Sequence, residues 1–187
     1  MTSSENLYLY NELDRSVYGT KYFFVSVGRE QLVKVVEYAY VGVKEGRLTY
    51  NLGFGTYGAT EDKLLDIDLS NNGDAYRVLN TVLSTVPHFL CHYPGAMIMV
   101  AGSDSADAFP KYCRTICKKK CIPPDCKNAN RRINIYRRFV NKNFAALSNF
   151  YRFLGGVKIN NVDNEYVVEE YVVKKNYDSV FLVKNNS

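Results

Sequence analysis

Residues 21–41 read KYFFVSVGREQLVKVVEYAYV. Both halves of this stretch are rich in aromatic and β-branched residues, which favour strands. Gly28–Glu30 separates the halves with residues that permit a turn, so the stretch predicts an antiparallel hairpin. Arg47–Phe54 continues in the same style and is expected to form a third strand.

The apolar spacing changes to three and four residues after Asn71–Asp74. Apolar side chains then recur as far as Leu90, which predicts an amphipathic helix. The expected N-cap is Asp74 or Asn72, because a short side-chain acceptor satisfies free backbone amides at a helix start. Pro87 is expected to kink or end this helix at about the preceding residue.

The remaining segments predict more strands and a second helix. Helical spacing returns over Arg131–Tyr151, with Tyr136, Val140, Phe144 and Leu147 expected to pack on the sheet. The other strands are expected within Glu61–Leu69, Ala96–Ala101, Val157–Ile159, Tyr166–Val173 and Ser179–Val183. The predicted fold class is therefore α+β, with an antiparallel β-sheet and two main α-helices.

A long loop is expected between the apolar strand and the second helix. Ser103–Asn130 shows no period and contains three prolines and four cysteines. We therefore treat residues 104–130 as a basic cysteine-containing insertion in a single domain that spans residues 1–187. Loops of this length are uncommon in compact domains unless they have a staple or a function.

The composition excludes several classes of protein. Of the 187 residues, 47% are hydrophobic and 23% are charged, which is typical of globular proteins and not of disordered chains. No apolar run reaches the ~18 residues of a membrane span. Because Met1–Asn11 is polar and acidic, no signal peptide is expected either, and the expected location is the cytoplasm.

The positive charge is concentrated in one segment. Residues 105–144 hold eleven Lys or Arg against two Asp, a net charge of +9 in a chain whose total is +5. Such a segment is typical of surfaces that bind polyanions. A solvated helix face and a loop kept soluble by lysines would give the same pattern.

Two groups of residues are candidate sites. Gly102-Ser103 follows the apolar strand, and a Gly turn, a hydroxyl and arginine side chains together suit a phosphate or carboxylate. The candidate anion-binding residues are Gly102, Ser103, Arg132, Tyr136 and Arg138.

The second group consists of four closely spaced cysteines. Cys113, Cys117, Cys121 and Cys126 lie within fourteen residues and are candidate ligands of one structural zinc ion. Free thiols and two disulfides are the alternatives, although disulfides need an oxidising compartment. Two histidines, His88 and His92, are one helical turn apart, but no third ligand accompanies them, so they are interpreted as core or surface residues.

Five segments, in this order, are similar to those of a known family. They are Asn51–Gly55, Asn71–Asp74, Val78–Val82, the Gly102-Ser103 turn, and a helix with Arg132, Ile135, Tyr136, Arg138, Lys142 and Asn143. Over roughly Tyr22–Leu154 the chain resembles a family of small bacterial proteins of unknown function, with NLGFGD-, NNGD-, KVLATV- and GST…RTRLY-like motifs. The chain departs from this pattern at Asn134, which replaces an arginine, and in the cysteine-containing insertion. The resemblance implies no established activity, and Arg132 is its best candidate for an anion site.

These observations favour a non-enzymatic binding module. Its basic loop and helix would bind a polyanion, such as nucleic acid or a nucleotide, or an acidic protein partner. The alternative is an enzyme that acts on a nucleotide or phosphorylated substrate, such as a bacterial toxin or phage-defence effector. The sequence does not decide whether the protein is an enzyme. No membrane partner is expected, and the aromatic strands are compatible with a homodimer.

Overall fold

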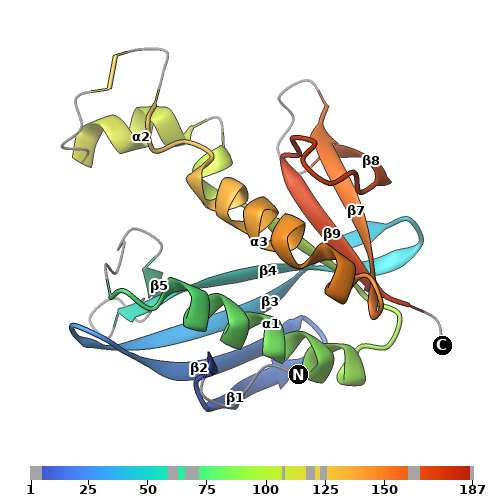
Figure 1. Cartoon of the computed structure of the whole chain (residues 1–187), viewed down its shortest axis with the longest axis horizontal. Coiled ribbons are helices and arrows are strands. Elements are labelled where there is room, and N and C mark those ends of the chain that lie inside the picture. Colours follow the sequence, from blue (N-terminus) through green and yellow to red (C-terminus); the bar gives the residue numbers. More distant parts are fainter. Residues whose placement is uncertain are drawn as a thin grey trace. The chain divides into compact units, whose positions relative to one another are not determined.

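The computed structural model describes residues 6–58, 63–65, 72–106, 108–116, 121–122, 126–159 and 165–185 (Figure 1). The chain divides into two compact units, residues 1–96 and 97–187. Each unit combines antiparallel strands with helices, which confirms the predicted α+β class. Among the described residues, no helix is long and apolar enough to cross a membrane.

The first unit is an antiparallel sheet with one long helix. Its elements are β1 (Tyr10–Ser16), β2 (Gly19–Val27), β3 (Gln31–Lys44), β4 (Arg47–Gly58), β5 (Lys63–Leu65) and α1 (Ala75–His92). Strands β1 to β4 are neighbours in chain order, and β5 pairs with β4. The predicted hairpin is β2–β3, in which Val25 pairs with Val33. Of the strand expected within Glu61–Leu69, the structure describes Lys63–Leu65 only.

Aromatic packing holds α1 against the sheet. Phe89 is fully buried, and its ring centroid lies 4.1 Å from that of Tyr38, 5.1 Å from Tyr50 and 4.6 Å from Tyr93. Each such pair contributes about 0.5–1.5 kcal/mol beyond burial alone. Phe89 follows Pro87, so this packing offsets the hydrogen bond that proline removes. The helix therefore continues to His92, so of the two outcomes expected at Pro87, a kink or an end near Val86, the second was wrong.

The segment before α1 clamps the β2–β3 hairpin. The side-chain amide of Asn72 donates to the carbonyl of Glu30 at 3.0 Å, and its oxygen accepts the Glu30 N–H at 3.0 Å. The Asp74 carboxylate accepts the hydroxyls of Ser26 at 2.5 Å and Tyr8 at 2.7 Å. A Cβ on Gly28 would lie 2.2 Å from the carbonyl oxygen of Asn72, so only glycine fits there.

The side chain of Asp74 does not cap α1 as expected. Asp74 occupies the N-cap position of α1, but its side chain makes no hydrogen bond to the first turn. The carboxylate binds Ser26 and Tyr8 instead, because these hydroxyls from distant segments reach it. Asn72 and Asp74 thus connect the start of α1 to the β2–β3 hairpin and to Tyr8.

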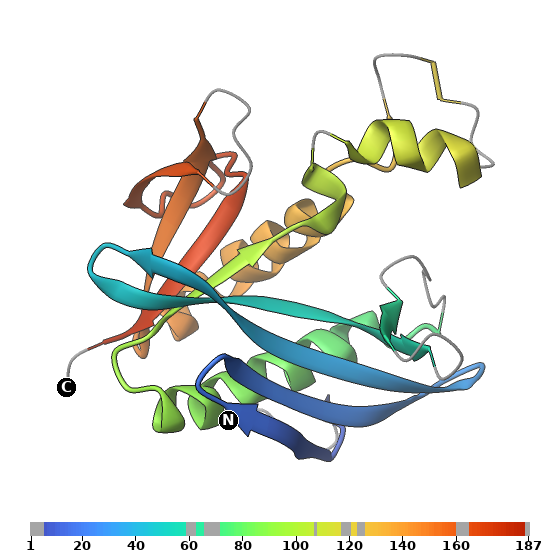
Figure 2. The same cartoon turned by 180° about the vertical axis from the view of Figure 1, so that it is seen from behind.

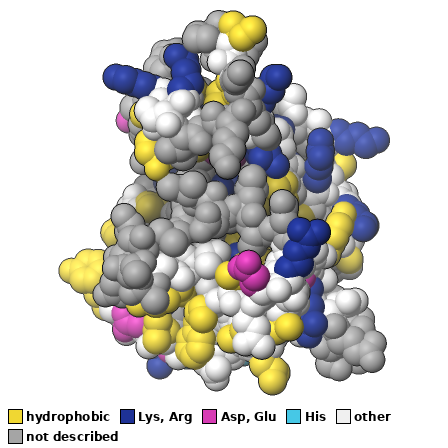
Figure 3. Space-filling view, turned by 90° about the vertical axis from the view of Figure 1, so that its left-hand side faces the viewer, with side chains coloured by type: hydrophobic (Ala, Val, Ile, Leu, Met, Phe, Trp, Pro, Cys, Tyr) yellow, Lys and Arg dark blue, Asp and Glu magenta, His cyan; other side chains and the backbone are white. Residues whose placement is uncertain are grey.

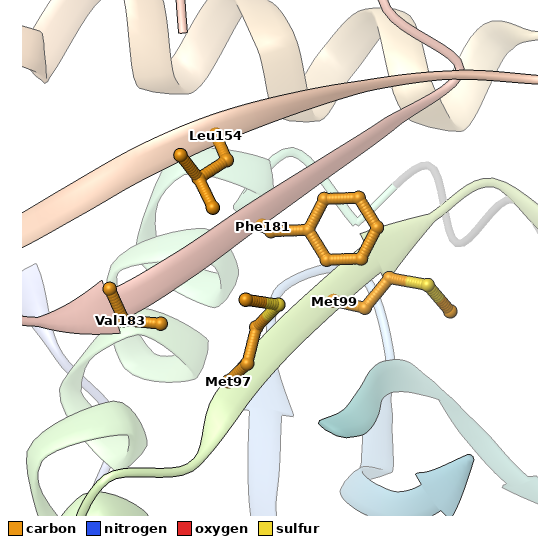
Figure 4. Close-up of a cluster of buried hydrophobic side chains, with 5 residues drawn as sticks. All are labelled: Met97, Met99, Leu154, Phe181 and Val183. Carbon is orange, nitrogen blue, oxygen red and sulfur yellow. The ribbon is translucent and has the colours of Figure 1, made fainter. Parts of the chain in front are cut away.

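The second unit is also an antiparallel sheet with helices. Its elements are β6 (Met97–Ala101), a 3₁₀ helix η2 (Ser103–Ser105), α2 (Phe109–Ile116), α3 (Arg131–Leu147), β7 (Tyr151–Lys158), β8 (Tyr166–Glu170) and β9 (Ser179–Lys184). The strand order is β6-β9-β7-β8. Side chains from β6, β7 and β9 form a buried cluster of Met97, Met99, Leu154, Phe181 and Val183 (Figure 4).

Two expectations for the second unit were wrong. Residues 104–130 are not one long loop, because they contain η2 and α2. Pro110 lies in the first turn of α2, where its missing N–H costs nothing. The second predicted helix ends at Leu147, and Tyr151 starts β7.

The sheet-facing side of α3 is only half-buried. Tyr136, Val140, Phe144 and Leu147 are of intermediate burial, and Ile133 is the fully buried residue of this helix. Phe144 nevertheless packs on aromatic rings, with ring centroids 5.8 Å from those of both Phe153 and Tyr171.

The clamp predicts a large stability loss for Asn72→Ala. The variant removes the acceptor of the Glu30 N–H and one of two donors to the Glu30 carbonyl, which also accepts the Gly28 N–H at 3.2 Å. The loss of these bonds should cost about 1–3 kcal/mol. Urea unfolding should show this loss, whereas Asn11→Ala, on the exposed strand β1, should unfold as the wild type does. Equal midpoints for the two variants would contradict the proposed role of Asn72.

Candidate polyanion-binding site

The turn after β6 brings Gly102 against the start of α3. A Cβ on Gly102 would lie 2.5 Å from Oδ1 of Asp104 and 3.1 Å from the backbone nitrogen of Ile133. Any larger residue would therefore push η2 away from the helix. The structure thus brings the predicted Gly102 next to the first turn of α3, and Ser103 lies exposed in η2.

A carboxylate of the chain occupies the N-terminus of α3. Asp104 is 5% exposed, and its Oδ2 accepts the N–H of Arg132 at 3.0 Å. The carbonyl of Asp104 accepts the N–H of Asn130 at 3.1 Å. Burial raises the pKa of the Asp104 carboxyl, although the backbone N–H bonds oppose this shift. An anion is stabilised at a helix N-terminus, and here the protein supplies that anion itself.

Arg132 and Tyr136 lie together near this carboxylate. They are one helical turn apart, and both are half-buried. Burial lowers the pKa of Arg132 and raises that of Tyr136 to about 12, and the two groups interact electrostatically. At neutral pH the pair is therefore a cation beside a neutral phenol. An external anion at this position would meet the charge of Asp104 as well as that of Arg132.

Arg138 belongs to a different face of α3. It is six residues after Arg132, which places it about 120° away around the helix. The predicted residues therefore divide into a half-buried cluster, formed by Gly102, Arg132 and Tyr136, and the exposed Arg138.

An exposed stripe runs along α3. It consists of Arg131, Ile135, Arg138 and Lys142, at spacings of four, three and four residues. All but Arg131 are exposed, and Arg131 donates to Oδ1 of Asn128 at 3.4 Å. The helical period of the sequence already separates these residues from the apolar side. Sequence reasoning nevertheless left Arg131, Ile135 and Lys142 out of the candidate site.

The other arginine of this region has a structural role. Arg137 donates to the carbonyl of Tyr177 at 3.0 Å, and Asn141, one turn later, accepts the Tyr171 hydroxyl at 3.0 Å. These bonds attach α3 to the segment between β8 and β9. They fix the rotation of the helix about its axis, and thus the direction of the exposed stripe.

The surface around this stripe contains little negative charge. Lys111 and Arg114 of α2 and Lys127 are exposed. Between residues 103 and 147, the one carboxylate that the structure describes is Asp104, and it is buried. Lys118–Lys120, Asp107 and Asp125 lie outside the described residues. Figure 3 shows one face of the molecule on which Lys and Arg side chains are more widespread than Asp and Glu.

Three of the four candidate cysteine ligands lie around one turn. The N–H of Lys127 donates to Sγ of Cys121 at 3.3 Å, and the Asn128 amide donates to Sγ of buried Cys113 at 3.4 Å. Hydrogen bonds from the Asn128 N–H and from the Cys113 thiol lower the pKa of Cys126.

No disulfide joins the described cysteines to one another, and among the described residues no three Cys, His, Asp or Glu side chains form a metal-binding group. The fourth candidate ligand, Cys117, lies outside the described residues. The zinc ion therefore stays a prediction.

The two histidines of α1 interact with protein groups. His88 lies 3.2 Å from the Tyr10 hydroxyl. His92 lies 2.8 Å from the Arg15 guanidinium and 3.8 Å from the Glu12 carboxylate.

A family model described as a family of unknown function (DUF6934) matches residues 6–118. The chain belongs to this family. The predicted resemblance to a family of unknown function is therefore confirmed, and the match includes α2, in the segment expected to be an insertion. The match ends before α3, so it does not cover the helix motif around Arg132. No curated protein and no solved structure matches the chain.

The buried carboxylate predicts opposite effects for two substitutions of Asp104. Asp104→Ala removes the acceptor at the start of α3 and should cost about 0.5–2 kcal/mol of stability. Asp104→Asn keeps an oxygen for the Arg132 N–H and removes the buried charge, so it should be at least as stable as the wild type at pH 7.

The pH dependence follows from the raised pKa of Asp104. The folded state binds the proton more tightly than the unfolded state, so this group opposes folding when ionised. Lowering the pH through its folded-state pKa should stabilise the wild type relative to Asp104→Asn. Thermal unfolding as a function of pH tests this. A difference that stays constant with pH would contradict the buried, ionised carboxylate.

Proposed function

We propose that this protein is a non-enzymatic binding module and that the exposed stripe of α3 binds the phosphate backbone of a nucleic acid. The observation that carries the proposal is the pair Arg138 and Lys142. Both side chains are exposed and lie one helical turn apart on the same face of α3, where they can contact neighbouring phosphates of one strand.

The dimensions of the stripe suit a phosphate backbone. From Arg131 to Lys142 the helix rises ~16 Å. Phosphates follow one another at ~3.4 Å per strand along a duplex axis, so the stripe spans several of them. Two arginines in the stripe present planar forks that suit phosphate oxygens. The exposed Lys111 and Arg114 of α2 add cations to the same unit.

The half-buried cluster is a weaker candidate for an anion site. Asp104 already occupies the helix N-terminus beside Arg132, and its carboxylate repels a second anion. For this reason we assign the binding of the polyanion to Arg138 and Lys142 and do not extend the proposal to an enzyme that acts on nucleotides.

The proposal predicts that Arg138→Ala/Lys142→Ala weakens nucleic-acid binding at least tenfold. Fluorescence anisotropy with a labelled 20-base-pair DNA should also show a shallower salt dependence. The slope of log K against log salt should fall by about two, because each lost phosphate contact removes ~0.9. Circular dichroism and thermal unfolding check that the variant is folded.

Arg29→Ala/Lys184→Ala is the matched control. Both residues are exposed, and their loss changes the net charge equally. This control should keep nearly all of the affinity. If both double variants bind alike, net charge and not the stripe determines binding. If neither the wild type nor the variants bind DNA, the proposal is wrong.

We further propose that Cys113, Cys117, Cys121 and Cys126 bind one structural zinc ion. The support is that the hydrogen bonds of Cys113 and Cys121 place both sulfurs around the turn that contains Cys126. Thiolate sulfur is a preferred zinc ligand, and N–H donors stabilise its charge. The ion would connect the end of α2 to the start of α3.

Elemental analysis of protein purified without added metal tests this site. About one zinc ion per chain is expected, and Cys126→Ser should lose most of it. Cys91→Ser is the matched control, because Cys91 is an exposed free cysteine of α1 and should not affect the metal content. Wild-type protein without zinc, or equal zinc in both variants, would refute the site.

A further inference from the structure

Tyr112 is an exposed aromatic residue in the basic segment of the second unit. Its side chain is 49% exposed, and Lys111 and Arg114 of the same helix, α2, are exposed as well. In a helix the Cα atoms of these two cations lie within ~5.5 Å of that of Tyr112. In the described part of the chain, no second ring and no hydrogen-bond partner holds the Tyr112 side chain. The buried tyrosines of the first unit, in contrast, pack on other rings.

Asn128 links the helix that contains Tyr112 to the start of the exposed stripe. Its side-chain amide donates to Sγ of Cys113, the residue after Tyr112, at 3.4 Å. Its Oδ1 accepts a hydrogen bond from Arg131, the first residue of the stripe, at 3.4 Å. Cys113 is 4% exposed, so one side of α2 is anchored while Tyr112 faces solvent. In Figure 2, as in Figure 1, α2 lies beyond the N-terminal end of α3, so it extends the stripe at that end.

Ile135 is a second apolar side chain among cations, within the exposed stripe itself. It is 43% exposed, and Arg131 and Arg138 lie on the same face of α3, four residues before it and three residues after it. Contact with phosphates alone requires only cations. A strand of nucleic acid, however, presents the flat apolar faces of its bases beside its phosphates. Cations that alternate with apolar side chains suit both parts of such a strand.

We infer that this surface binds single-stranded nucleic acid, with an unpaired base stacked on Tyr112 and the neighbouring phosphates on the exposed stripe. The inference rests on the proposed function, because it names the class of nucleic acid that the same surface takes. Proteins that bind single strands combine a positively charged surface with aromatic side chains on which bases stack. Tyr112 and the stripe provide these two components within one unit, and Asn128 holds them together.

Tyr112 contributes to the binding of a single strand and not to that of a duplex. A duplex presents its phosphates to the exposed stripe, but its bases are stacked on one another and leave no free face for a tyrosine ring. Extruding a paired base has an energetic cost similar to the gain from stacking it on one aromatic side chain. The affinity that depends on Tyr112 therefore distinguishes unpaired bases from phosphate charge.

An oligonucleotide without bases separates the two contributions. Fluorescence anisotropy compares a labelled 20-nucleotide thymidine strand with a strand of equal length in which abasic tetrahydrofuran units replace the nucleosides, so both carry the same phosphate charge. The wild type should bind the thymidine strand at least about fivefold more tightly. Tyr112→Ala should remove most of this difference, whereas Tyr112→Phe should keep it because the ring remains. Neither variant should change the affinity for the duplex.

Tyr18→Ala is the matched control. Tyr18 is 73% exposed in the turn between β1 and β2, outside the basic surface, and should bind neither strand. This variant should therefore show the same preference for the thymidine strand as the wild type. Equal binding of the two strands by the wild type, or an equal loss for both strands in Tyr112→Ala, would overturn the inference.

Arg138→Ala/Lys142→Ala separates a failure of this inference from a failure of the proposed function. It should weaken the binding of both strands alike, because both present phosphates to the stripe. If it does so while the bases make no difference, the stripe binds phosphates and the inference about Tyr112 is wrong. If the wild type binds neither the strands nor the duplex, both proposals are wrong.

Discussion

The hydrogen bond between the buried carboxylate of Asp104 and the N–H of Arg132 determines where α3 starts. It ties the turn after β6 to the first turn of the helix, across 28 residues of sequence. Arg137 and Asn141 then hold the middle of α3 to the segment that contains Tyr171 and Tyr177. Because these contacts fix the start of α3 and its rotation about its axis, they also fix the direction in which the exposed stripe points. The residues that make these contacts are not part of the stripe.

This arrangement separates two kinds of arginine that look alike in the sequence. Arg137 uses its guanidinium on a backbone carbonyl, and Arg132 is half-buried beside Tyr136. Arg138 points into solvent and shares a face with Lys142. Exposed cations on one face of a helix attract phosphate groups. That is the physical basis of the proposed phosphate binding.

Polar contacts also determine the roles of Asn72 and Asp74 in the first unit. Asn72 and Asp74 look like a helix start in the sequence, and a helix does begin after them. Their side chains, however, bind Glu30 and Ser26, more than forty residues earlier. Local spacing reveals the helix but cannot reveal such partners, since they depend on how the hairpin folds back over the segment.

Much of the fold could be predicted because strong local periods determine it. The β2–β3 hairpin, the start of α1 and the apolar strand β6 all follow from spacing and turn residues. Elements with weak local signals were missed. Strand β1 consists largely of polar and charged edge residues, and α2 was obscured because Pro110 was interpreted as a loop residue rather than as part of a first helical turn.

The candidate site was predicted in part. Helical spacing is enough to place Arg138 and Lys142 on the solvent side of α3, and the charge of the segment suggested a polyanion. The occupation of the helix N-terminus by Asp104 could not be foreseen, because it depends on the conformation of the chain between η2 and α3. This internal carboxylate moves the candidate interface from the Gly102-Ser103 turn to the exposed face of the helix.

The most direct measurement is an NMR titration of ¹⁵N-labelled protein with a short DNA duplex at low salt. The amide signals of Arg131, Ile135, Arg138 and Lys142 should shift together and saturate, and added salt should reverse the shifts. The amide of Arg132 should shift little, because it is bound to Asp104. Shifts centred on Gly102, Ser103 and Arg132, with the exposed stripe unchanged, would contradict the account.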